Sequence, residues 1–465
     1  MPPPVHLSEL LDLLPVDVAI TDPDRTARYS QDWARDPSAE VPLAVVRAEC
    51  TEHVSSTLAW AHRHGVPVVA RGAGTGLSGG ATAHSGVVVV SLERMTRVSV
   101  DDDARVATAQ AGVLNIDVKR AAHEHGLWYP PDPSSYEICS IGGNAATNAG
   151  GLCCVKYGVT ADFVLGMEVV LADGTIVRLG GPRLKDSAGY SLARLFVGSE
   201  GTLGVITEVT LRLLPAQAPA STLVAMFPSM IAATQAVLAI TRSCRPSMLE
   251  LMDRTSIAAV EAMTSMGIGR DAGALLLARS DAPGQAAALE IAQMEQACRD
   301  HGAGEVYATD DPAEGEAFAE VRRQALPAIE RLGSVLLEDV GVPVPALPAL
   351  VEGIEKIAET EGVTIAVIAH AGDGNTHPIL VFDPQDDRQL AAAETAFGSV
   401  MALALGLGGT ITGEHGVGRL KRSWLPEQLG DGAYALHQTI KHALDPTGIL
   451  NPGAVLSPTE WPERA

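Results

Sequence analysis

Short apolar strands alternate with amphipathic helical segments through most of this chain, beginning near residue 43. Val54, Leu58 and Ala61 recur at the spacing of one helix face, and Gly65 follows as a helix-terminating residue. Residues 172–174 (Ala-Asp-Gly) predict a hairpin, because Asp-Gly favours the tight turns that join antiparallel strands. The strands predicted in this half are 43–48, 66–70, 87–92, 169–171, 175–177 and 201–214.

The pattern changes after residues 215–219 (Pro-Ala-Gln-Ala-Pro), which we interpret as a linker. Strand-like runs cover residues 221–227, 247–252, 274–279, 334–340 and 363–369. Ala-rich helical segments cover residues 231–243, 255–264, 284–300, 313–331 and 347–361. This alternation predicts an α+β domain in which helices cover one sheet. We therefore divide the chain into residues 1–215, residues 216–410 and a C-terminal segment, 411–465.

Charge and composition narrow the class of protein. The chain has 33 Lys and Arg against 56 Asp and Glu, so its formal net charge is −23. This surplus argues against nucleic acid and anionic membranes as partners, since both require a basic face. We find no apolar stretch of the roughly 18 residues that a spanning helix requires, no secretory signal and no disulfide framework among the six cysteines. A soluble cytoplasmic protein is therefore expected.

Glycine is enriched, with 46 residues, and much of it lies in four segments: 72–80, 142–151, 198–204 and 406–418. In the first, Gly74, Gly76 and Gly79 match G-x-G-x-x-G, and Glu93 follows at the distance of a dinucleotide-binding acid. We reject that interpretation because only five residues separate the loop from Gly86, too few for the helix the motif needs. Successive glycines can instead turn backbone N–H groups toward a diphosphate, forming an anion-binding nest. A purely structural glycine turn is the alternative.

The second run, residues 141–151, follows a stiff Pro-Pro-Asp-Pro segment at 130–133. Its small residues, together with Asn144, Thr147 and Asn148, would allow a flat ring and a polyol chain to lie against the backbone. The alternative is a glycine-rich connection between domains.

These segments, with Tyr157-Gly158 and the run Gly-Ser-Glu-Gly-Thr-Leu-Gly at 198–204, resemble the vanillyl-alcohol-oxidase/PCMH flavoprotein superfamily. The resemblance is closest to the FAD-linked D-2-hydroxyacid dehydrogenases. It implies an α+β fold: a PCMH-type FAD-binding domain, 1–215, an α+β (ferredoxin-like) substrate cap, 216–410, and a segment, 411–465, that returns to the FAD domain. The first loop contains no His for a covalent tether, so the resemblance implies non-covalent FAD. The expected cofactor-binding residues are Arg71, Gly72, Ala73, Gly74, Thr75, Gly76, Ser78, Gly79, Pro131, Asp132, Gly142, Gly143, Asn144, Thr147, Asn148, Gly150, Glu200, Gly201, Ile206 and Asn451.

A metal site is predicted from two histidines and a glutamate. His370 ends an apolar strand and His377 begins the returning one, so both imidazoles should face one ion across a hairpin. Glu414 and His415 lie between glycines. Two His and one Glu form a divalent site with open positions, suited to Zn, Mn or Fe. The family pattern matches His370, His377 and Glu414 as ligands, His415 as the catalytic base and Asn375 as a polar group near the substrate.

This set suits the oxidation of a 2-hydroxy acid. The ion lowers the pKa of the substrate hydroxyl, an imidazole accepts the proton, and hydride passes to flavin N5. Arg322 resembles the family's carboxylate-binding arginine, although Arg323 could be the inward one. Leu336 and Leu337 are apolar where the 2-hydroxyglutarate enzymes carry a lysine, which favours a monocarboxylate such as lactate or glycolate.

Other features stay open at this stage. The family commonly has Lys where this chain has Ala454, so a flavin contact at that position is in doubt. The electron acceptor is external: a cytochrome, a quinone or an electron-transfer flavoprotein. A homodimer is one assembly to test. The alternatives are a partner-dependent or non-catalytic flavin subunit of a glycolate-oxidase-type complex, a D-2-hydroxyglutarate dehydrogenase and a flavin-dependent ether-lipid synthase.

Overall fold

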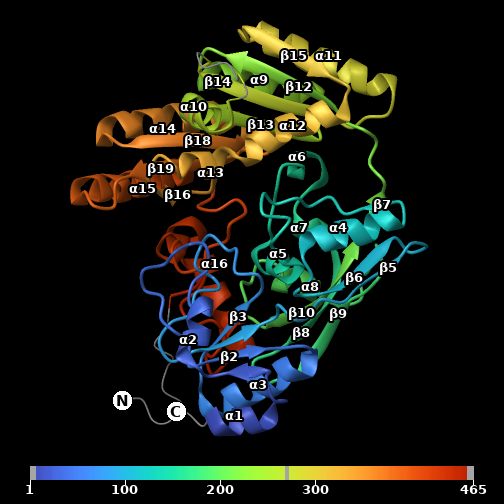
Figure 1. Cartoon of the computed structure of the whole chain (residues 1–465), viewed down its shortest axis with the longest axis vertical. Helices are drawn as coiled ribbons and strands as arrows, with labels where there is room; N and C mark the ends of the chain where they lie inside the picture. The colour runs from blue at the N-terminus through green and yellow to red at the C-terminus, as the bar shows by residue number, and fades with distance from the viewer. Residues whose placement is uncertain (1–6, 266, 268–271, 458–465) are drawn as a thin grey trace. The chain divides into compact units, whose positions relative to one another are not determined.

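The computed structural model describes residues 7–265, 267 and 272–457 (Figure 1). The chain forms two compact units. The first comprises residues 1–149, 159–216 and 414–465, and the second comprises residues 150–158 and 217–413. The short segment 150–158 therefore belongs with the second unit, although both its flanks belong to the first.

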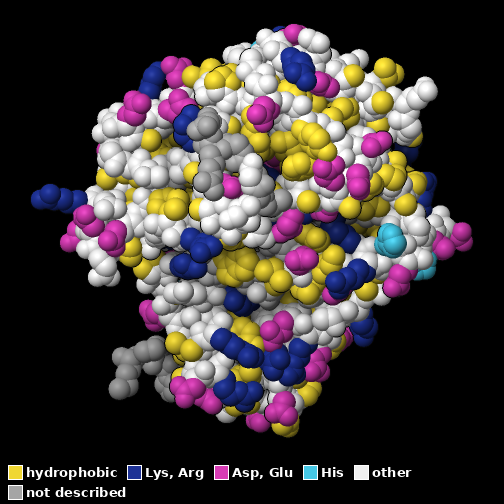
Figure 2. Space-filling model, turned by 45° about the horizontal axis from the view of Figure 1, so that its top comes forward, with side chains coloured by type: hydrophobic (Ala, Val, Ile, Leu, Met, Phe, Trp, Pro, Cys, Tyr) yellow, Lys and Arg dark blue, Asp and Glu magenta, His cyan; other side chains and the backbone are white. Residues whose placement is uncertain are grey.

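Acidic and basic side chains are intermixed on the face of the molecule drawn in Figure 2. Hydrophobic side chains lie between them over much of that face. The acidic residues, which outnumber the basic ones in the chain, are thus not gathered into a separate patch on this face.

The first unit contains a mixed four-stranded sheet, ordered β1-β2-β4-β3, and an antiparallel five-stranded sheet, ordered β5-β6-β10-β8-β9. Their bounds are β1 (Ala19–Ile20), β2 (Ala44–Arg47), β3 (Val68–Arg71), β4 (Val88–Ser91), β5 (Val98–Asp101), β6 (Val106–Gln110), β8 (Val164–Val170), β9 (Ile176–Gly180) and β10 (Val205–Arg212). A small pair joins β7 (Leu127–Trp128) to β11 (Leu214–Pro215). Strands β3 and β4 are parallel, so the glycine-rich residues 72–87 form the crossover between them.

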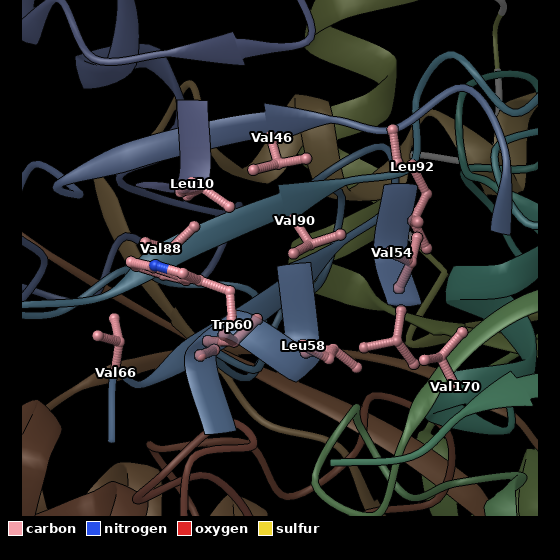
Figure 3. Close-up of a cluster of buried hydrophobic side chains, with 14 of the residues drawn as sticks. Leu10, Val46, Val54, Leu58, Trp60, Val66, Val88, Val90, Leu92 and Val170 are labelled. Carbon is pink, nitrogen blue, oxygen red and sulfur yellow. The ribbon is translucent and has the colours of Figure 1, made fainter. Parts of the chain in front are cut away.

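Helix α3 (Thr51–His64) supplies much of the core of this unit. Its Leu58 and Trp60 are fully buried and belong to one cluster with Val46, Val90 and Val170, which come from both sheets (Figure 3). The other helical segments are α1 (Leu7–Leu13), α2 (Pro23–Thr26), η1 (Ala27–Tyr29), α4 (Asn115–Glu124), α5 (Ile141–Thr147), α7 (Thr160–Phe163), α8 (Leu192–Phe196), η3 (Arg422–Trp424) and α16 (Leu425–Leu444).

The second unit is built on one antiparallel sheet, ordered β15-β12-β14-β13-β18-β19-β16, with β17 also paired to β19. Its strands are β12 (Ser221–Phe227), β13 (Met248–Asp253), β14 (Ala274–Ser280), β15 (Glu305–Thr309), β16 (Ser334–Leu337), β17 (Val340–Gly341), β18 (Thr364–His370) and β19 (Asn375–Phe382). Numbered along the chain, the first four strands lie in the order 4-1-3-2, which is the split βαβ arrangement of ferredoxin-like folds. The second half of the sheet extends this motif.

Helices cover both faces of this sheet. The helical segments are α6 (Cys154–Tyr157), α9 (Met230–Ser243), α10 (Arg254–Thr264), α11 (Gln285–Asp300), α12 (Pro312–Arg323), α13 (Ala325–Ile329), η2 (Val344–Ala346), α14 (Leu347–Glu361) and α15 (Asp387–Gly406). The single helix predicted for 313–331 is divided into α12 and α13. Pro327 has no N–H to donate to the carbonyl one turn earlier, which accounts for the division.

Helix α15 bears on the prediction that no segment spans a membrane. It is the one described helix that is long and apolar enough to do so, with 20 residues and a mean hydropathy of 1.2 in its most apolar window. It packs against α14 and β19. Length and composition alone are weak evidence, because the core helix of a globular domain meets the same criteria.

Candidate active site

The first glycine loop, after β3, is lined by backbone donors. Within the described residues, the amides of residues 74–80 donate to no protein acceptor. Gly74 and Gly79 have φ values of 77° and 81°, which residues other than glycine rarely adopt. Such a run of unclaimed N–H groups fits the predicted diphosphate nest.

The dinucleotide-type reading of this loop is excluded by the structure, as expected. No helix follows the motif, and the Glu93 carboxylate is occupied elsewhere. It accepts hydrogen bonds from Tyr29 Oη at 2.8 Å and from Arg47 Nε at 2.6 Å. Arg71, at the start of the loop, is buried, and desolvation lowers its pKa.

The second glycine run forms the short helix α5, with the Ser140 hydroxyl accepting from Gly143 N as its N-cap. Its polar side chains are already engaged within the protein: Asn144 Oδ1 accepts from Asn115 Nδ2 at 3.0 Å, Thr147 Oγ1 donates to Gly143 O, and Asn148 Oδ1 accepts from Ala161 N. Contact with a cofactor along this run would therefore fall to the backbone.

Two other predicted cofactor-binding residues, Pro131 and Gly142, make contacts within the protein around this run. Pro131 O accepts from Asn115 Nδ2, and a Cβ on Gly142 would lie 2.4 Å from the Ala111 Cβ. Asn115 itself lies at the N-terminus of α4. It is the first helical residue, and Leu114 is the N-cap. The remaining predicted positions differ in burial. Ala73 is exposed, Ile206 is buried in β10, and the half-buried ones are Gly72, Thr75, Gly76, Asp132 and Gly143. Gly150 belongs to the second unit.

Glu200 joins distant segments of the first unit. Its carboxylate accepts from Val417 N at 2.8 Å and from Gly418 N at 2.9 Å. Burial raises the pKa of Glu200 to about 7, although the two amides act in the opposite direction. Asn451 Nδ2 donates to Gly80 O and Glu200 O, so the C-terminal segment meets the first glycine loop here.

The loop that carries Glu414 and His415 is fixed through its backbone. Ser78 Oγ donates to His415 O at 3.0 Å, and Arg419 N donates to Ser78 O. His415 Nε2 lies 4.0 Å from Glu414 Oε1. A residue of the first glycine loop thus holds the backbone of the predicted catalytic base. Gly201, another predicted cofactor-binding residue, follows Glu200 in the chain and has a positive φ of 71°.

In the second unit, a polar cluster ends one apolar face of the sheet. Met248 and Met252 of β13, Ile368 of β18 and Ile379 of β19 lie in one buried cluster with residues of α10, α12 and α13. Because side chains alternate along a strand, Glu250, His370, His377 and Asn375 lie on this same face. The apolar face therefore leads into a cluster of buried polar and ionisable side chains.

The register corrects one detail of the predicted histidine pair. His370 pairs with Asn375 and His377 pairs with Ile368, so the histidines are diagonal rather than directly opposed. Their rings are nevertheless 5.1 Å apart and nearly perpendicular, and nitrogen atoms of the two lie within 4.8 Å. Diagonal neighbours on paired strands are within reach of such side chains.

Buried carboxylates stand behind both histidines. Glu250 accepts from His370 Nδ1 at 2.8 and 2.9 Å, and Asp339 Oδ1 lies 3.6 Å from His377 Nδ1. Asp339 Oδ2 also accepts from Thr412 Oγ1 and Gly413 N. Carboxylates at Nδ1 commonly orient metal-binding histidines and leave Nε2 toward the ion, so this donor set fits a divalent cation.

Arg322 is the inward arginine of the pair considered. It is 3% exposed and lies 2.9 Å from Glu250 Oε2, whereas Arg323 pairs with Glu316 and Glu320. Asn375 Oδ1 is buried and accepts no hydrogen bond from the described residues. A buried arginine and a buried acceptor without a protein donor are each suited to bind a polar ligand.

Sequence reasoning missed Glu250 and Asp339. A signal for each was present, because Glu250 interrupts an apolar strand (Met-Leu-Glu-Leu-Met) and Asp339 follows the apolar run at 335–337. A charge inside a buried strand requires a partner. The identity of that partner depends on strand register, which the sequence does not state.

The segment 150–158 is held in the second unit by another buried charge. The Asp281 carboxylate accepts from Lys156 Nζ, Tyr157 Oη and Gln217 Nε2. Burial alone would raise the pKa of Asp281, but these three donors lower it below its ordinary value. Cys153 and Cys154 in this segment form no disulfide bond, like the other four cysteines.

Two solved structures share the fold of this chain. The solved structure of p-cresol methylhydroxylase matches with a TM-score of 0.80, at 17% identity, over 97% of this chain and 96% of that one. Alkyldihydroxyacetonephosphate synthase matches with a TM-score of 0.74, at 20% identity, over 96% and 85%. Identities this low show the fold alone, which is the predicted α+β fold with a PCMH-type FAD-binding domain.

The family follows from sequence comparison. The family description "FAD binding domain" matches residues 42–180, and "FAD linked oxidases, C-terminal domain" matches residues 216–455, which is more than half of the chain. The chain belongs to the FAD-linked oxidases, and the predicted family and FAD cofactor are confirmed.

Named relatives cover most of the chain. Glycolate oxidase subunit GlcD of Bacillus subtilis is 40% identical over 432 residues, 92% of each chain. The GlcD subunit of Escherichia coli K12 is 40% identical over 89% of this chain and 83% of its own length. A D-lactate dehydrogenase of Archaeoglobus fulgidus is 37% identical over 90% and 93%. The protein is therefore an FAD-linked oxidoreductase of this type.

Proposed function

We propose that the protein oxidises a D-2-hydroxy monocarboxylic acid to the 2-oxo acid with the assistance of a divalent ion. The observation that carries the proposal is the pair His370 and His377, each with a buried carboxylate at Nδ1. His370 and His377 would hold Zn, Mn or Fe together with Glu414, which follows Gly413 in the chain.

The residues divide the work. When bound, FAD accepts a hydride and the divalent ion withdraws electron density from the substrate hydroxyl. His415 accepts the hydroxyl proton, a task suited to an imidazole near neutral pH. Arg322 binds the substrate carboxylate through its planar guanidinium, and Asn375 Oδ1 accepts a hydrogen bond from the substrate.

The substrate class follows from the apolar strand β16. Leu337 pairs with Ile379 and packs against the same cluster, on the face that carries His377. A second carboxylate has no counter-ion at Leu336 or Leu337. We therefore propose lactate, glycolate or a longer aliphatic 2-hydroxy acid, which matches the names of the relatives.

The first test follows the flavin. Purified protein should show a flavin absorption spectrum that D-lactate bleaches anaerobically, with L-lactate and D-2-hydroxyglutarate much slower. Acid precipitation should release the FAD, since we propose that it is held non-covalently. A colourless protein, or a flavin that no D-2-hydroxy acid bleaches, contradicts the proposal.

Two perturbations test the residues. His415→Ala should retain the flavin spectrum while its reduction slows by about 10²–10⁴-fold, the usual contribution of a general base. Chelation should slow reduction without unfolding the protein, and one of Zn²⁺, Mn²⁺ or Fe²⁺ should restore the rate. Unchanged reduction in both experiments would show that the site is wrongly assigned.

A second candidate is a flavin subunit that requires partners, because two relatives are named as subunits. Reduction of an artificial dye by the isolated chain would exclude it. The same assay, with a cytochrome, a quinone or an electron-transfer flavoprotein in place of the dye, identifies the acceptor. Sedimentation measures whether the chain is a homodimer.

A further inference from the structure

The buried carboxylate of Glu250 lies between two side chains of different proposed roles. Glu250 occupies the middle of β13, where its neighbours Leu249 and Leu251 are buried, and is itself 1% exposed. Its register partner on β18 is His370. A charge at such a position is costly unless its partners hold it, so its contacts are informative.

Both carboxylate oxygens are engaged within the second unit. Glu250 Oε1 and Oε2 lie 2.8 and 2.9 Å from His370 Nδ1, and Oε2 lies 2.9 Å from Arg322 Nη2. A single carboxylate thus contacts the first proposed ion ligand and the proposed substrate-binding arginine.

This arrangement has two consequences. An acceptor at Nδ1 places the proton of a neutral imidazole there, which leaves the lone pair on Nε2 for an ion. The same acceptor is the counter-ion that fixes the guanidinium of Arg322 in a buried setting. We propose that Glu250 is a positioning residue shared by the ion site and the carboxylate site, an inference that rests on the proposed function.

The neighbouring arginine offers a matched control. Arg323, one residue along α12, pairs with Glu316 at 2.6 Å, and the Glu316 side chain is 55% exposed. Glu316 also pairs with Arg279 at 3.1 Å, so Glu316→Gln removes two Arg–Glu pairs without touching a histidine. It should leave ion binding unchanged.

The experiment titrates Zn²⁺ or Mn²⁺ into metal-free full-length protein against a chromophoric chelator. Glu250→Gln should raise the dissociation constant of the ion by about 10–100-fold, the usual effect of removing such a partner, whereas Glu316→Gln should not. At saturating ion, kcat should recover while the KM for D-lactate stays raised, because Arg322 has lost its orienting partner. Circular dichroism reports whether each variant is folded.

A double variant guards against misfolding. Removing Glu250 alone leaves Arg322 buried without a counter-ion, so Glu250→Gln combined with Arg322→Gln removes the pair together. It should fold and still bind the ion about 10–100-fold more weakly.

The outcomes separate this inference from the proposed function. If folded Glu250 variants bind the ion as tightly as the wild type while His370→Ala does not, the role of Glu250 is wrong and the ion site stands. If His370→Ala binds the ion as tightly as the wild type, the proposed ion site itself is wrong.

Discussion

The two units build their sites from different materials. In the first, the glycine loop 72–80 presents backbone N–H groups, and its specificity depends on how closely segments approach one another. In the second, buried charged side chains such as Glu250 and Arg322 contact one another directly. We expect a site built from backbone groups to be damaged by substitutions that add volume. We expect a site built from buried charges to be damaged by substitutions that remove one partner of a charged pair or shift the strand register.

Substitution of Asp281 gives the largest expected effect among the buried charged groups of the second unit. Asp281→Ala leaves three donors without their shared acceptor, among them Lys156 and Tyr157 in the segment 150–158. We expect a loss of about 3–5 kcal/mol in the free energy of unfolding, since breaking a buried pair strands its partner. The measurement is the urea midpoint followed by circular dichroism.

An exposed acid of the same unit is the control. Asp300, at the end of α11, accepts one exposed hydrogen bond from Gln296. Asp300→Ala should change the unfolding free energy by less than about 0.5 kcal/mol. Equal effects at the two positions would remove the distinction between buried and exposed charges in this unit.

The two constructions also explain what the sequence could predict. The glycine loops were found because their signal is local: five glycines within residues 72–80 exceed what a turn requires. The strands of the second unit were located for the same reason, except β15, which was missed, and β17, which the predicted run 334–340 joined to β16. Glu250 and Asp339 were missed because their meaning depends on which strands pair, and His370 was wrongly set opposite His377 because a hairpin loop does not fix its own register. The family resemblance supplied the roles of Arg322, Asn375 and His415, which spacing alone would not have given.

Gly418 tests the backbone construction of the first unit. It has a φ of 51°, and a Cβ there would lie 2.0 Å from the backbone oxygen of Ser78. Gly418→Ala should cost about 2–4 kcal/mol, because strain in the left-handed region adds to overpacking. It should also weaken FAD retention, measured by the flavin released on dialysis.

Gly86 provides the matched position. It has a φ of 79°, and a Cβ there would meet no atom within 4 Å, so Gly86→Ala carries the conformational cost without the clash. A loss of about 1 kcal/mol with full FAD retention is expected. If both substitutions have the same effect on stability and FAD retention, the close approach of Gly418 to the Ser78 backbone is not what stabilises the glycine loop.

Glu200 refines the comparison, since it is one of the buried charged groups of the first unit and lies beside the glycine-rich segments. Its pKa is raised from the ordinary 4.5 to about 7, chiefly by burial. Between these values the folded protein therefore holds a proton that the unfolded chain has released, and stability falls as pH rises from about 4.5 through 7. Glu200→Gln should remove this slope, about 3 kcal/mol across the window, while its amide oxygen still accepts from Val417 N and Gly418 N. The measurement is the difference in unfolding free energy between wild type and variant at several pH values. A difference that does not vary with pH would mean that Glu200 stays ionised, and that the backbone amides around it, rather than its burial, set its charge.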